Sequence, residues 1–315
     1  MSIKSYKKGN VVQDYLFIKN LIAKTASNGS RYFNLILTDK AFDEIDGRMW
    51  DVSKADEEEF VPGVLVKVRA AVQEYNGKLQ VIIQKIRLAN EGDPVSIDDF
   101  VHAAPFSSEA MLGDIKKVIA NFKNEDLKAI TLSLVEDKEK ALMYFPAAKR
   151  HHHALKGGLL YHTLSMLKIG MVLAPLYPFI NADLLYAGII LHDLGKVDEM
   201  ISDPNGIVSD YTTEGKLLGH IVTGIADLKL KGEELGTDPE ILLLLEHMLL
   251  SHHYEAEYGS PKRPMFAEAE LLHHIDVIDA RMNTMERIQN TLEPGTFSDN
   301  QWSLDGIQVY RTTFK

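Results

Sequence analysis

The stretch VLVKVRAAVQEYNGKLQVIIQKIRLA, residues 64–89, decides the fold of the first third of the chain. Two runs rich in valine, isoleucine and leucine, 64–75 and 78–89, flank the dipeptide Asn76-Gly77. Asn-Gly is strongly favoured in a tight turn between antiparallel strands, because both central positions need a positive φ angle. The stretch therefore predicts a β-hairpin.

Further strands are predicted upstream of this hairpin. Residues 14–26 are rich in β-formers, residues 31–39 alternate apolar and polar side chains, and residues 47–51 form a third short candidate strand. Residues 54–60 are polar and favour a short helix. Five strands with a helix between the third and fourth is the order of an OB-fold barrel, which binds single-stranded nucleic acid across strands 2 and 3. We therefore expect a multi-domain chain with an N-terminal OB-fold β-barrel at 1–90.

The predicted barrel has candidate contacts for nucleic acid that combine positive charge with flat side chains on which bases stack. These residues are Lys19, Lys24, Arg31, Tyr32, Phe33, Arg48 and Trp50. The alternative is that the aromatic members fill the core, since the interior of a small barrel is packed with side chains. Both interpretations stay open at this point.

Charge is distributed unevenly along the 315 residues. The whole chain has a net charge of −11 and residues 1–90 have +3, so the remaining residues have −14. A basic module suits a polyanion and an acidic one suits cations, although both charges could serve solubility alone. The absence of cysteine excludes disulfides, a thiolate nucleophile and Cys-ligated metals, so any metal must be held by nitrogen and oxygen.

The rest of the chain predicts a helical domain. Residues 91–106 contain glycine, two prolines and several acids without periodicity, and we expect a linker there. Helical apolar spacing then recurs over residues 109–122, 125–142, 157–173, 181–197, 217–232, 238–253 and 266–288. We therefore expect an all-α bundle at 107–290, followed by a C-terminal extension at 291–315.

Neither secretion nor a membrane is indicated. The N-terminus lacks the apolar core of a secretion signal, and no run approaches the ~18 apolar residues of a membrane span. We therefore expect a soluble, cytoplasmic protein. Apolar alternation in residues 302–314 could add a strand to a neighbouring subunit or cover the domain's own surface, and we favour a homo-oligomer.

Histidine is concentrated in one window of the chain. Eleven of the 12 histidines lie between His151 and His274, where an even distribution would put roughly 5. The candidate metal ligands, in order, are His162, the pair His192-Asp193, His220, the pair His252-His253, and Asp276. Imidazole and carboxylate together suit a divalent first-row metal, and two adjacent metals that share Asp193 would use the whole set. The alternative is a group of unrelated core histidines.

This order of ligands resembles that of the HD-domain phosphohydrolase superfamily in its two-metal form. The resemblance implies one metal held by His162, His192, Asp193 and Asp276, and another held by Asp193, His220, His252 and His253. It also implies that Lys196 lies near the phosphate and that the two divalent ions activate a water for attack on phosphorus. Mn²⁺ is favoured, with Fe, Co or Mg as alternatives, because histidine–carboxylate sites with open positions suit octahedral ions.

The resemblance becomes narrower when the whole chain is considered. A barrel stands ahead of the helical domain, and PAAKRHHHALKGGLLYHTLSML (146–167) leads into the first ligand. In this the chain resembles the YhaM-type 3′-to-5′ exoribonucleases of Gram-positive bacteria. The resemblance implies hydrolysis of single-stranded RNA, with single-stranded DNA as a second candidate, from the 3′ end to nucleoside 5′-monophosphates.

Further residues are expected to assist the reaction. Lys149, Arg150 and His153 precede the first ligand and are expected to bind substrate phosphates, and the catalytic set is then Asp193, Lys196, His153 and Arg281. Asp279 shares a helical face with Asp276, and we expect it to support that ligand.

Two other functions stay open. A nucleotide phosphohydrolase or cyclic-dinucleotide phosphodiesterase would use the same metals, but a small substrate needs no strand-binding barrel. HHYEAEYGSPKRP (252–264) resembles the cyclic-dinucleotide branch, although Gly259-Ser260-Pro261 stands where that branch has Gly-Tyr-Pro. A single-stranded DNA-binding replication or regulatory protein with a vestigial site is the third hypothesis, and the completeness of the ligand set opposes it.

Overall fold

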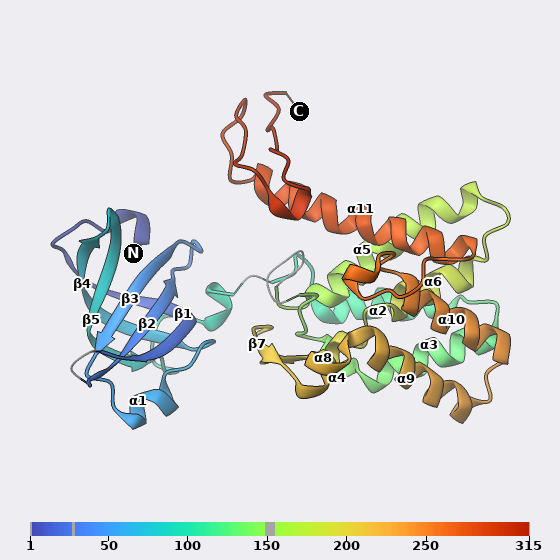
Figure 1. The fold of residues 1–315 in the computed structure, drawn as a ribbon, viewed down its shortest axis with the longest axis horizontal. Helices are drawn as coiled ribbons and strands as arrows, with labels where there is room; N and C mark the ends of the chain where they lie inside the picture. The colour runs from blue at the N-terminus through green and yellow to red at the C-terminus, as the bar shows by residue number, and fades with distance from the viewer. Residues whose placement is uncertain (1, 27–28, 102, 149–154, 315) are drawn as a thin grey trace. The chain divides into compact units, whose positions relative to one another are not determined.

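The chain divides into two compact units, Met1–His102 and Ala103–Lys315 (Figure 1). The structure is a computed structural model that describes residues 2–26, 29–101, 103–148 and 155–314. The division falls inside the segment 91–106, where the sequence predicts a linker. The finer limits at residues 90, 106 and 290 stay predictions.

The first unit is a closed five-stranded barrel with the strand order β1-β2-β3-β5-β4. Its elements are β1 (Val11–Thr25), β2 (Arg31–Thr38), β3 (Glu44–Trp50), α1 (Lys54–Glu59), β4 (Leu65–Tyr75) and β5 (Lys78–Leu88), with 3₁₀ turns at Ile3–Ser5 and Ile97–Asp99. β3 and β5 pair in parallel, the other neighbours are antiparallel, and α1 lies between β3 and β4 in the chain. This is OB-fold topology, so the fold prediction is confirmed.

Alternation in β2 builds the core of this barrel. Phe33, Leu35 and Leu37 are buried, while the side chains between them point to the opposite face of the strand. The predicted hairpin is confirmed, because Asn76 and Gly77 have φ angles of 50° and 76° and the strands on either side pair. The expectation that Phe33 contacts nucleic acid is wrong, because its side chain is 0% exposed.

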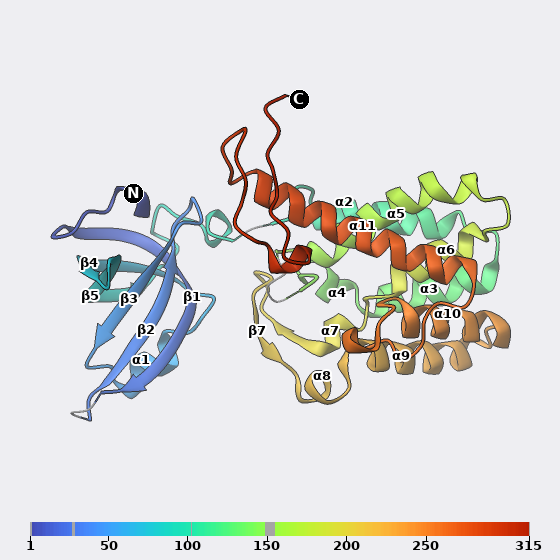
Figure 2. The ribbon, with the colours of Figure 1, turned by 45° about the horizontal axis from the view of Figure 1, so that its top comes forward.

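The second unit is built from helices. They are α2 (Ser108–Ala120), α3 (Glu125–Asp137), α4 (Glu139–Leu142), α5 (Gly158–Leu173), α6 (Ala182–Leu191), α7 (Lys196–Glu199), α8 (Thr213–Leu217), α9 (Gly219–Leu235), α10 (Pro239–Ser251) and α11 (Ala267–Gln289), with 3₁₀ turns at Ala174–Leu176, Ala256–Tyr258 and Trp302–Leu304. The long helix α11 packs against α5 and α6, and α10 packs against α9 (Figures 1 and 2). The domain is not purely helical, because β6 (Met200–Ser202) and β7 (Val208–Tyr211) form a small antiparallel hairpin.

One predicted helix, over residues 181–197, ends earlier than expected. α6 stops at Leu191, and a turn separates it from α7. The physical reason is a close approach of backbones at Gly195, where a Cβ atom would lie 2.4 Å from the carbonyl oxygen of His220 and 3.0 Å from Gly224 N. The turn therefore lies directly against α9.

Carboxylates tie the N-termini of four helices together. Glu268 of α11 accepts a hydrogen bond from Asn181 N (2.6 Å), Asp183 of α6 accepts from Lys123 N (2.6 Å) and Asn124 N (3.0 Å), and Asp126 of α3 accepts from Asp238 N (2.9 Å). The first backbone N–H groups of a helix have no partner within the helix, and the helix dipole favours negative charge at that end. These bonds therefore fix α3, α6, α10 and α11 relative to one another.

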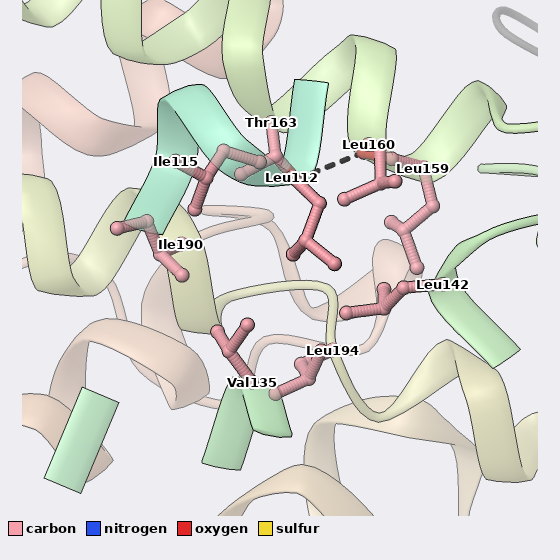
Figure 3. Close-up of a pocket in the computed structure, with 9 residues that line it drawn as sticks. All are labelled: Leu112, Ile115, Val135, Leu142, Leu159, Leu160, Thr163, Ile190 and Leu194. Carbon is pink, nitrogen blue, oxygen red and sulfur yellow. Dashed lines mark hydrogen bonds between the residues drawn. The ribbon is translucent and has the colours of Figure 1, made fainter. Parts of the chain in front are cut away.

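The core of the helical domain is tightly filled. Figure 3 shows a small void between α2, α3, α5 and α6, lined by Leu112, Ile115, Val135, Leu142, Leu159, Leu160, Thr163, Ile190 and Leu194. Its volume is about 10 Å³ and its lining is apolar apart from the hydroxyl of Thr163, which donates to Leu159 O (2.9 Å). The void is a packing defect and too small to hold a substrate.

One helical stretch, Gly158–Leu176, is long and apolar enough to cross a membrane by length and composition, with a mean hydropathy of 1.4. Half of that window is buried inside the domain. Its apolar character is that of a core helix packed between α6 and α11.

The C-terminal segment folds back on the end of α11 (Figure 1). Gly295 N donates to Arg311 O (2.8 Å) and Ser298 N donates to Val309 O (2.9 Å), while Leu304 and Val309 pack with Ile288. The segment thus covers part of its own domain, which was one of the two expected possibilities. Trp302 and Phe314 remain 84% and 80% exposed.

The first prediction follows from the hydrogen bonds between carboxylates and helix N-termini. We expect Asp183→Ala to lower the free energy of unfolding by about 1 to 2 kcal/mol, because two backbone N–H groups lose a charged acceptor. Urea unfolding followed by far-ultraviolet circular dichroism measures this change. Asp114→Ala, which removes an exposed ion pair with Lys117, is the control and should change stability by less than about 0.5 kcal/mol. Equal losses in the two variants would contradict the assignment.

Candidate metal centre

The helical domain brings all the predicted metal ligands to one place. His162 lies in α5, His192 follows the end of α6, and Asp193 occupies the turn after it. His220 lies in the first turn of α9, the pair His252-His253 follows α10, and Asp276 lies in α11. The ligands on α5, α6 and α9, together with Asp193 and His252, are buried.

The carboxylate of Asp193 is the centre of the cluster. Its Oδ2 lies 3.3 Å from His192 Nε2 and 3.8 Å from His162 Nε2. Its Oδ1 lies 3.4 Å from His220 Nε2 and 3.8 Å from His252 Nε2. Each oxygen therefore faces its own pair of imidazoles, as a carboxylate that bridges two cations would.

Two ligand groups result from this arrangement. The ligand atoms of Asp193, His220, His252 and His253 lie within 4.8 Å of one another, and so do those of His162, His192 and Asp193. Asp276 Oδ1 lies 3.3 Å from His162 Nε2, which places this carboxylate beside the second group. The groups match the two ligand sets that the resemblance implies.

The donor atoms of the cluster suit divalent cations. Nε2 of His192, His220 and His252 and Oδ1 of Asp193 are buried and have no hydrogen-bond partner. Leaving a buried polar atom unsatisfied costs about 1 to 3 kcal/mol. Several such atoms directed at a common space, all imidazole nitrogen or carboxylate oxygen, form a donor set that fits first-row divalent metals.

The outward nitrogen of each imidazole has a partner that fixes the ring. Nδ1 donates to a backbone carbonyl in His192 (Ile189 O, 2.8 Å), His252 (Leu249 O, 2.7 Å) and His253 (Tyr258 O, 2.6 Å). It faces a carboxylate in His162 (Asp279 Oδ2, 2.7 Å) and His220 (Glu199 Oε2, 3.3 Å). A donating Nδ1–H leaves the lone pair on Nε2, so each ring is oriented for metal binding.

Asp279 therefore has a different partner from the one expected. The sequence predicts that it supports Asp276, which is one helical turn earlier. Its Oδ2 instead lies 2.7 Å from Nδ1 of His162 on α5, and Asp279 is buried. Sharing a helical face did not identify the ligand that this carboxylate contacts.

The candidate ligands differ in the direction of their pKa shifts. Burial, together with the neighbouring imidazoles, lowers the pKa of His252 and His253, so both rings are neutral ligands. Burial raises the pKa of Asp193, but Lys196 and the surrounding histidines lower it well below its usual value. Burial lowers the pKa of His162, but hydrogen bonds to Asp276 and Asp279 outweigh it and raise the pKa to about 9. Metal binding at His162 must therefore displace a proton.

Lys196 and Arg281 have different environments. Lys196 Nζ lies 2.6 Å from Asp193 Oδ2 and its side chain is 13% exposed. Burial lowers the pKa of Lys196, but Asp193 raises it by a larger amount, so the ammonium stays charged beside the ligands. Arg281 Nη1 instead pairs with Asp305 Oδ2 at 2.7 Å on the C-terminal segment, and its contact with substrate stays a prediction.

The remaining catalytic and phosphate-binding candidates of this domain, Lys149, Arg150 and His153, lie outside the residues that the structure describes.

The barrel carries an aromatic–cationic cluster on strands β2, β3 and β4. The rings of Tyr32 and Trp50, which are register partners, lie 4.8 Å apart. The guanidinium of Arg48 lies 5.9 Å from the ring of Trp50 and 5.4 Å from the ring of Tyr75. Lys24 is exposed and pairs in register with Tyr32. Tyr75 is an addition to the predicted set.

Two of the predicted cations already contact carboxylates. Lys19 pairs with Glu44, and Arg31 Nε lies 2.6 Å from Glu57 Oε1. These partners are exposed or partly exposed, so a polyanion could compete for the cations. Their contact with nucleic acid stays a prediction.

Sequence reasoning missed Glu199 and Tyr75. Glu199 stands three residues after Lys196 in a four-residue helix, and the sequence does not show that this helix lies against α9. Tyr75 directly precedes the predicted Asn-Gly turn, so the sequence predicts its position at the end of the hairpin. The sequence does not predict its contact with Arg48.

Several known proteins are similar to this chain. A family profile described as HD domain matches residues 159–281. A Geobacillus sp. (strain WCH70) protein named 3′-5′ exoribonuclease YhaM is 44% identical over 312 residues, which cover 99% of this chain and 95% of the relative. The protein of that name from Bacillus subtilis (strain 168) is 42% identical over 312 residues, which cover 99% of this chain and 98% of the relative. The second OB-fold domain of replication protein A from Methanococcus maripaludis aligns with 30% of this chain and 98% of its own, with 14% identity and a TM-score of 0.24.

The unsatisfied ligand atoms make the second prediction. We expect Mn²⁺ to stabilise the protein by about 2.7 kcal/mol when free Mn²⁺ is a hundredfold above its dissociation constant, because only the folded chain assembles the ligands. Calorimetric melting with Mn²⁺ and with a chelator measures the shift. Asp193→Asn should lose most of it, whereas Asp210→Asn on the exposed β7 strand should keep it. A shift of equal size in Asp193→Asn would contradict the shared-carboxylate centre.

Proposed function

This chain belongs to the family of YhaM 3′-5′ exoribonucleases, and we propose that it removes nucleotides from the 3′ end of single-stranded RNA with the aid of two divalent metal ions. The observation that carries the proposal is the convergence of imidazoles from four helical elements on the single carboxylate of Asp193. The products are nucleoside 5′-monophosphates, and single-stranded DNA is a second substrate class.

The metals are held in two positions that share Asp193. His162, His192 and Asp276 complete one position, and His220, His252 and His253 complete the other. When bound, such ions supply a nucleophilic water at neutral pH and positive charge for the phosphate oxygens. Mn²⁺ is the proposed ion, with Fe, Co or Mg as alternatives, because these ions accept mixed nitrogen and oxygen ligands and keep open positions.

The reaction is hydrolysis of the last phosphodiester bond. An oxygen–phosphorus bond forms from water, the bond between phosphorus and the 3′ oxygen of the preceding nucleotide breaks, and that oxygen leaves with a proton. The chain then ends in a new 3′ hydroxyl, and the released nucleotide keeps the phosphate on its 5′ oxygen. The residues of this chain position the phosphate and balance its charge.

Lys196 contributes charge to this step. Its ammonium lies beside Asp193, and this carboxylate keeps it protonated by raising its pKa although burial lowers it. A buried cation next to the phosphate stabilises the negative charge that grows on the non-bridging oxygens in the transition state. We assign the same task to His153 and Arg281, and substrate binding upstream of the reacting bond to Lys149 and Arg150.

The barrel is proposed to hold the strand upstream of its 3′ end. The cluster of Tyr32, Arg48 and Trp50 offers stacking surfaces and a cation on the strands that OB folds use. Lys19, Lys24 and Arg31 extend the positive charge around it. The net charge of +3 on residues 1–90 attracts RNA, which the acidic remainder of the chain repels except at its metals.

We also propose that the enzyme is cytoplasmic and forms a homo-oligomer. A cysteine-free chain fits a reducing compartment. The exposed apolar side chains of Trp302 and Phe314 support an interface between copies of the C-terminal segment.

A substrate panel tests the function. The protein is incubated with Mn²⁺ and end-labelled single-stranded RNA, single-stranded DNA and a cyclic dinucleotide in parallel. We expect stepwise shortening of RNA from the 3′ end with release of 5′-monophosphates, and loss of that activity in Asp193→Ala with RNA binding retained. Hydrolysis of the cyclic dinucleotide alone would favour the small-substrate function. Binding of DNA without hydrolysis of any substrate would favour a binding protein.

Strand binding by the barrel makes a separate prediction. We expect Trp50→Ala to weaken binding of a long single strand about 10-fold, because stacking of one base on an aromatic ring is worth about 1 to 3 kcal/mol. Hydrolysis of a dinucleotide should not change. Fluorescence anisotropy with labelled RNA measures the affinity, and Phe179→Ala, which removes a 73% exposed ring from the helical domain, is the control. If the two variants bound RNA with equal affinity, Trp50 would not be part of the RNA-binding surface.

A further inference from the structure

The two proposed metal positions differ in the charge that surrounds them. On the side of His162 and His192, the carboxylates of Asp276 and Asp279 contact His162 at 3.3 and 2.7 Å. On the side of His220, His252 and His253, two carboxylates among the described residues lie within 4 Å of an imidazole. One is the shared Asp193 and the other is Glu199. The second position therefore has one negative group where the first has two.

Lys196 lies on the side of the first position. Asp193 contributes one oxygen to each position, and the ammonium of Lys196 lies 2.6 Å from Oδ2, the oxygen that faces His162 and His192. This positive charge offsets part of the negative charge of Asp276 and Asp279. The feature that distinguishes the second position is therefore its dependence on one carboxylate, that of Glu199.

Glu199 is fixed in place by its own surroundings. Its Oε1 accepts a hydrogen bond from His220 N (3.2 Å) and its Oε2 lies 3.3 Å from His220 Nδ1, so both oxygens contact one ligand residue. Its backbone carbonyl accepts from Thr212 N (2.9 Å), and a Cβ atom on Gly215 would lie 2.2 Å from that oxygen. The side chain is 14% exposed. The β6–β7 hairpin and α8 therefore hold Glu199 against His220.

We propose that Glu199 is the positioning residue that sets metal affinity at the His220–His252–His253 position. This inference rests on the proposed two-metal function. Hydrogen bonding to a carboxylate orients an imidazole and raises its basicity, and loss of such a partner typically costs 10- to 100-fold in metal affinity. With a single carboxylate of this kind, the second position depends on it more strongly.

The consequence for the enzyme is that its metal requirement depends on this contact. A chain with only the His162–His192 position filled lacks the second cation that the proposed reaction uses. Weaker binding at the His220–His252–His253 position therefore raises the metal concentration that hydrolysis requires.

The test is the Mn²⁺-binding isotherm of the full-length protein, with Glu199→Gln compared with the unchanged chain. Glutamine keeps the shape and one of the two acceptor oxygens but removes the charge. Isothermal calorimetry gives the two dissociation constants, and electron paramagnetic resonance separates single Mn²⁺ ions from coupled pairs. Glu246→Gln is the control, because Glu246 is a 21% exposed carboxylate on α10 that pairs with Lys229, away from the ligands.

We expect two dissociation constants for the unchanged chain. Glu199→Gln should weaken one of them about 10- to 100-fold, leave the other within about 2-fold, and show single-ion resonance where the unchanged chain shows coupled pairs. Asp279→Asn should instead weaken the other constant. Two unchanged constants in Glu199→Gln, or equal weakening of both, would overturn the inference while two-metal binding by the unchanged chain would leave the proposed function intact. No metal binding by the unchanged chain would overturn both.

Discussion

The helical domain depends on burying one carboxylate, that of Asp193, between imidazoles that come from α5, α6, α9 and the end of α10. A charge at 3% exposure is costly unless opposite charge or hydrogen bonds compensate for it. The ammonium of Lys196 compensates for part of the Asp193 charge, and cations bound by the imidazoles would compensate for the rest. The fold must therefore bring four separate helical segments within about one side-chain length of a single turn.

Glycine makes that approach possible. Gly195 directly follows the ligand turn and lies against the backbone of His220 and Gly224, where a Cβ atom would clash with the carbonyl of His220. Gly188, one helical turn before His192, lies so close to Met248 that a Cβ atom would meet the end of that side chain at 2.1 Å. A side chain at position 195 would push the ligand turn away from α9 and separate the ligands, whereas at Gly188 the flexible end of Met248 would have to shift. The close packing of the turn and α7 against α9, and of α6 against α10, is thus a condition of the centre.

Residue type and the resemblance to the HD-domain order were enough to select the side chains that converge on Asp193, and their role as metal ligands stays a prediction. The Asn-Gly hairpin was predictable, since its backbone angles admit few residues. Asp279 and Glu199 were not identified correctly, because their partners are set by packing between helices and not by spacing along one. Phe33 shows the same limit in the barrel, since strand alternation gives two faces but does not say which one is buried.

The ligand helices also need restraints that are independent of metal. Several buried lone pairs directed at one space oppose the close approach of α6, α9 and α10, at a cost of about 1 to 3 kcal/mol for each unsatisfied atom. The carboxylates of Glu268, Asp183 and Asp126 join the N-termini of α3, α6 and α10 to neighbouring helices at the opposite end of α6 from His192. Charge-assisted hydrogen bonds of this kind are about as strong as the cost they oppose. The domain can therefore hold its ligands near their binding geometry before any cation binds. The free energy of metal binding then does not have to offset the cost of assembling the site.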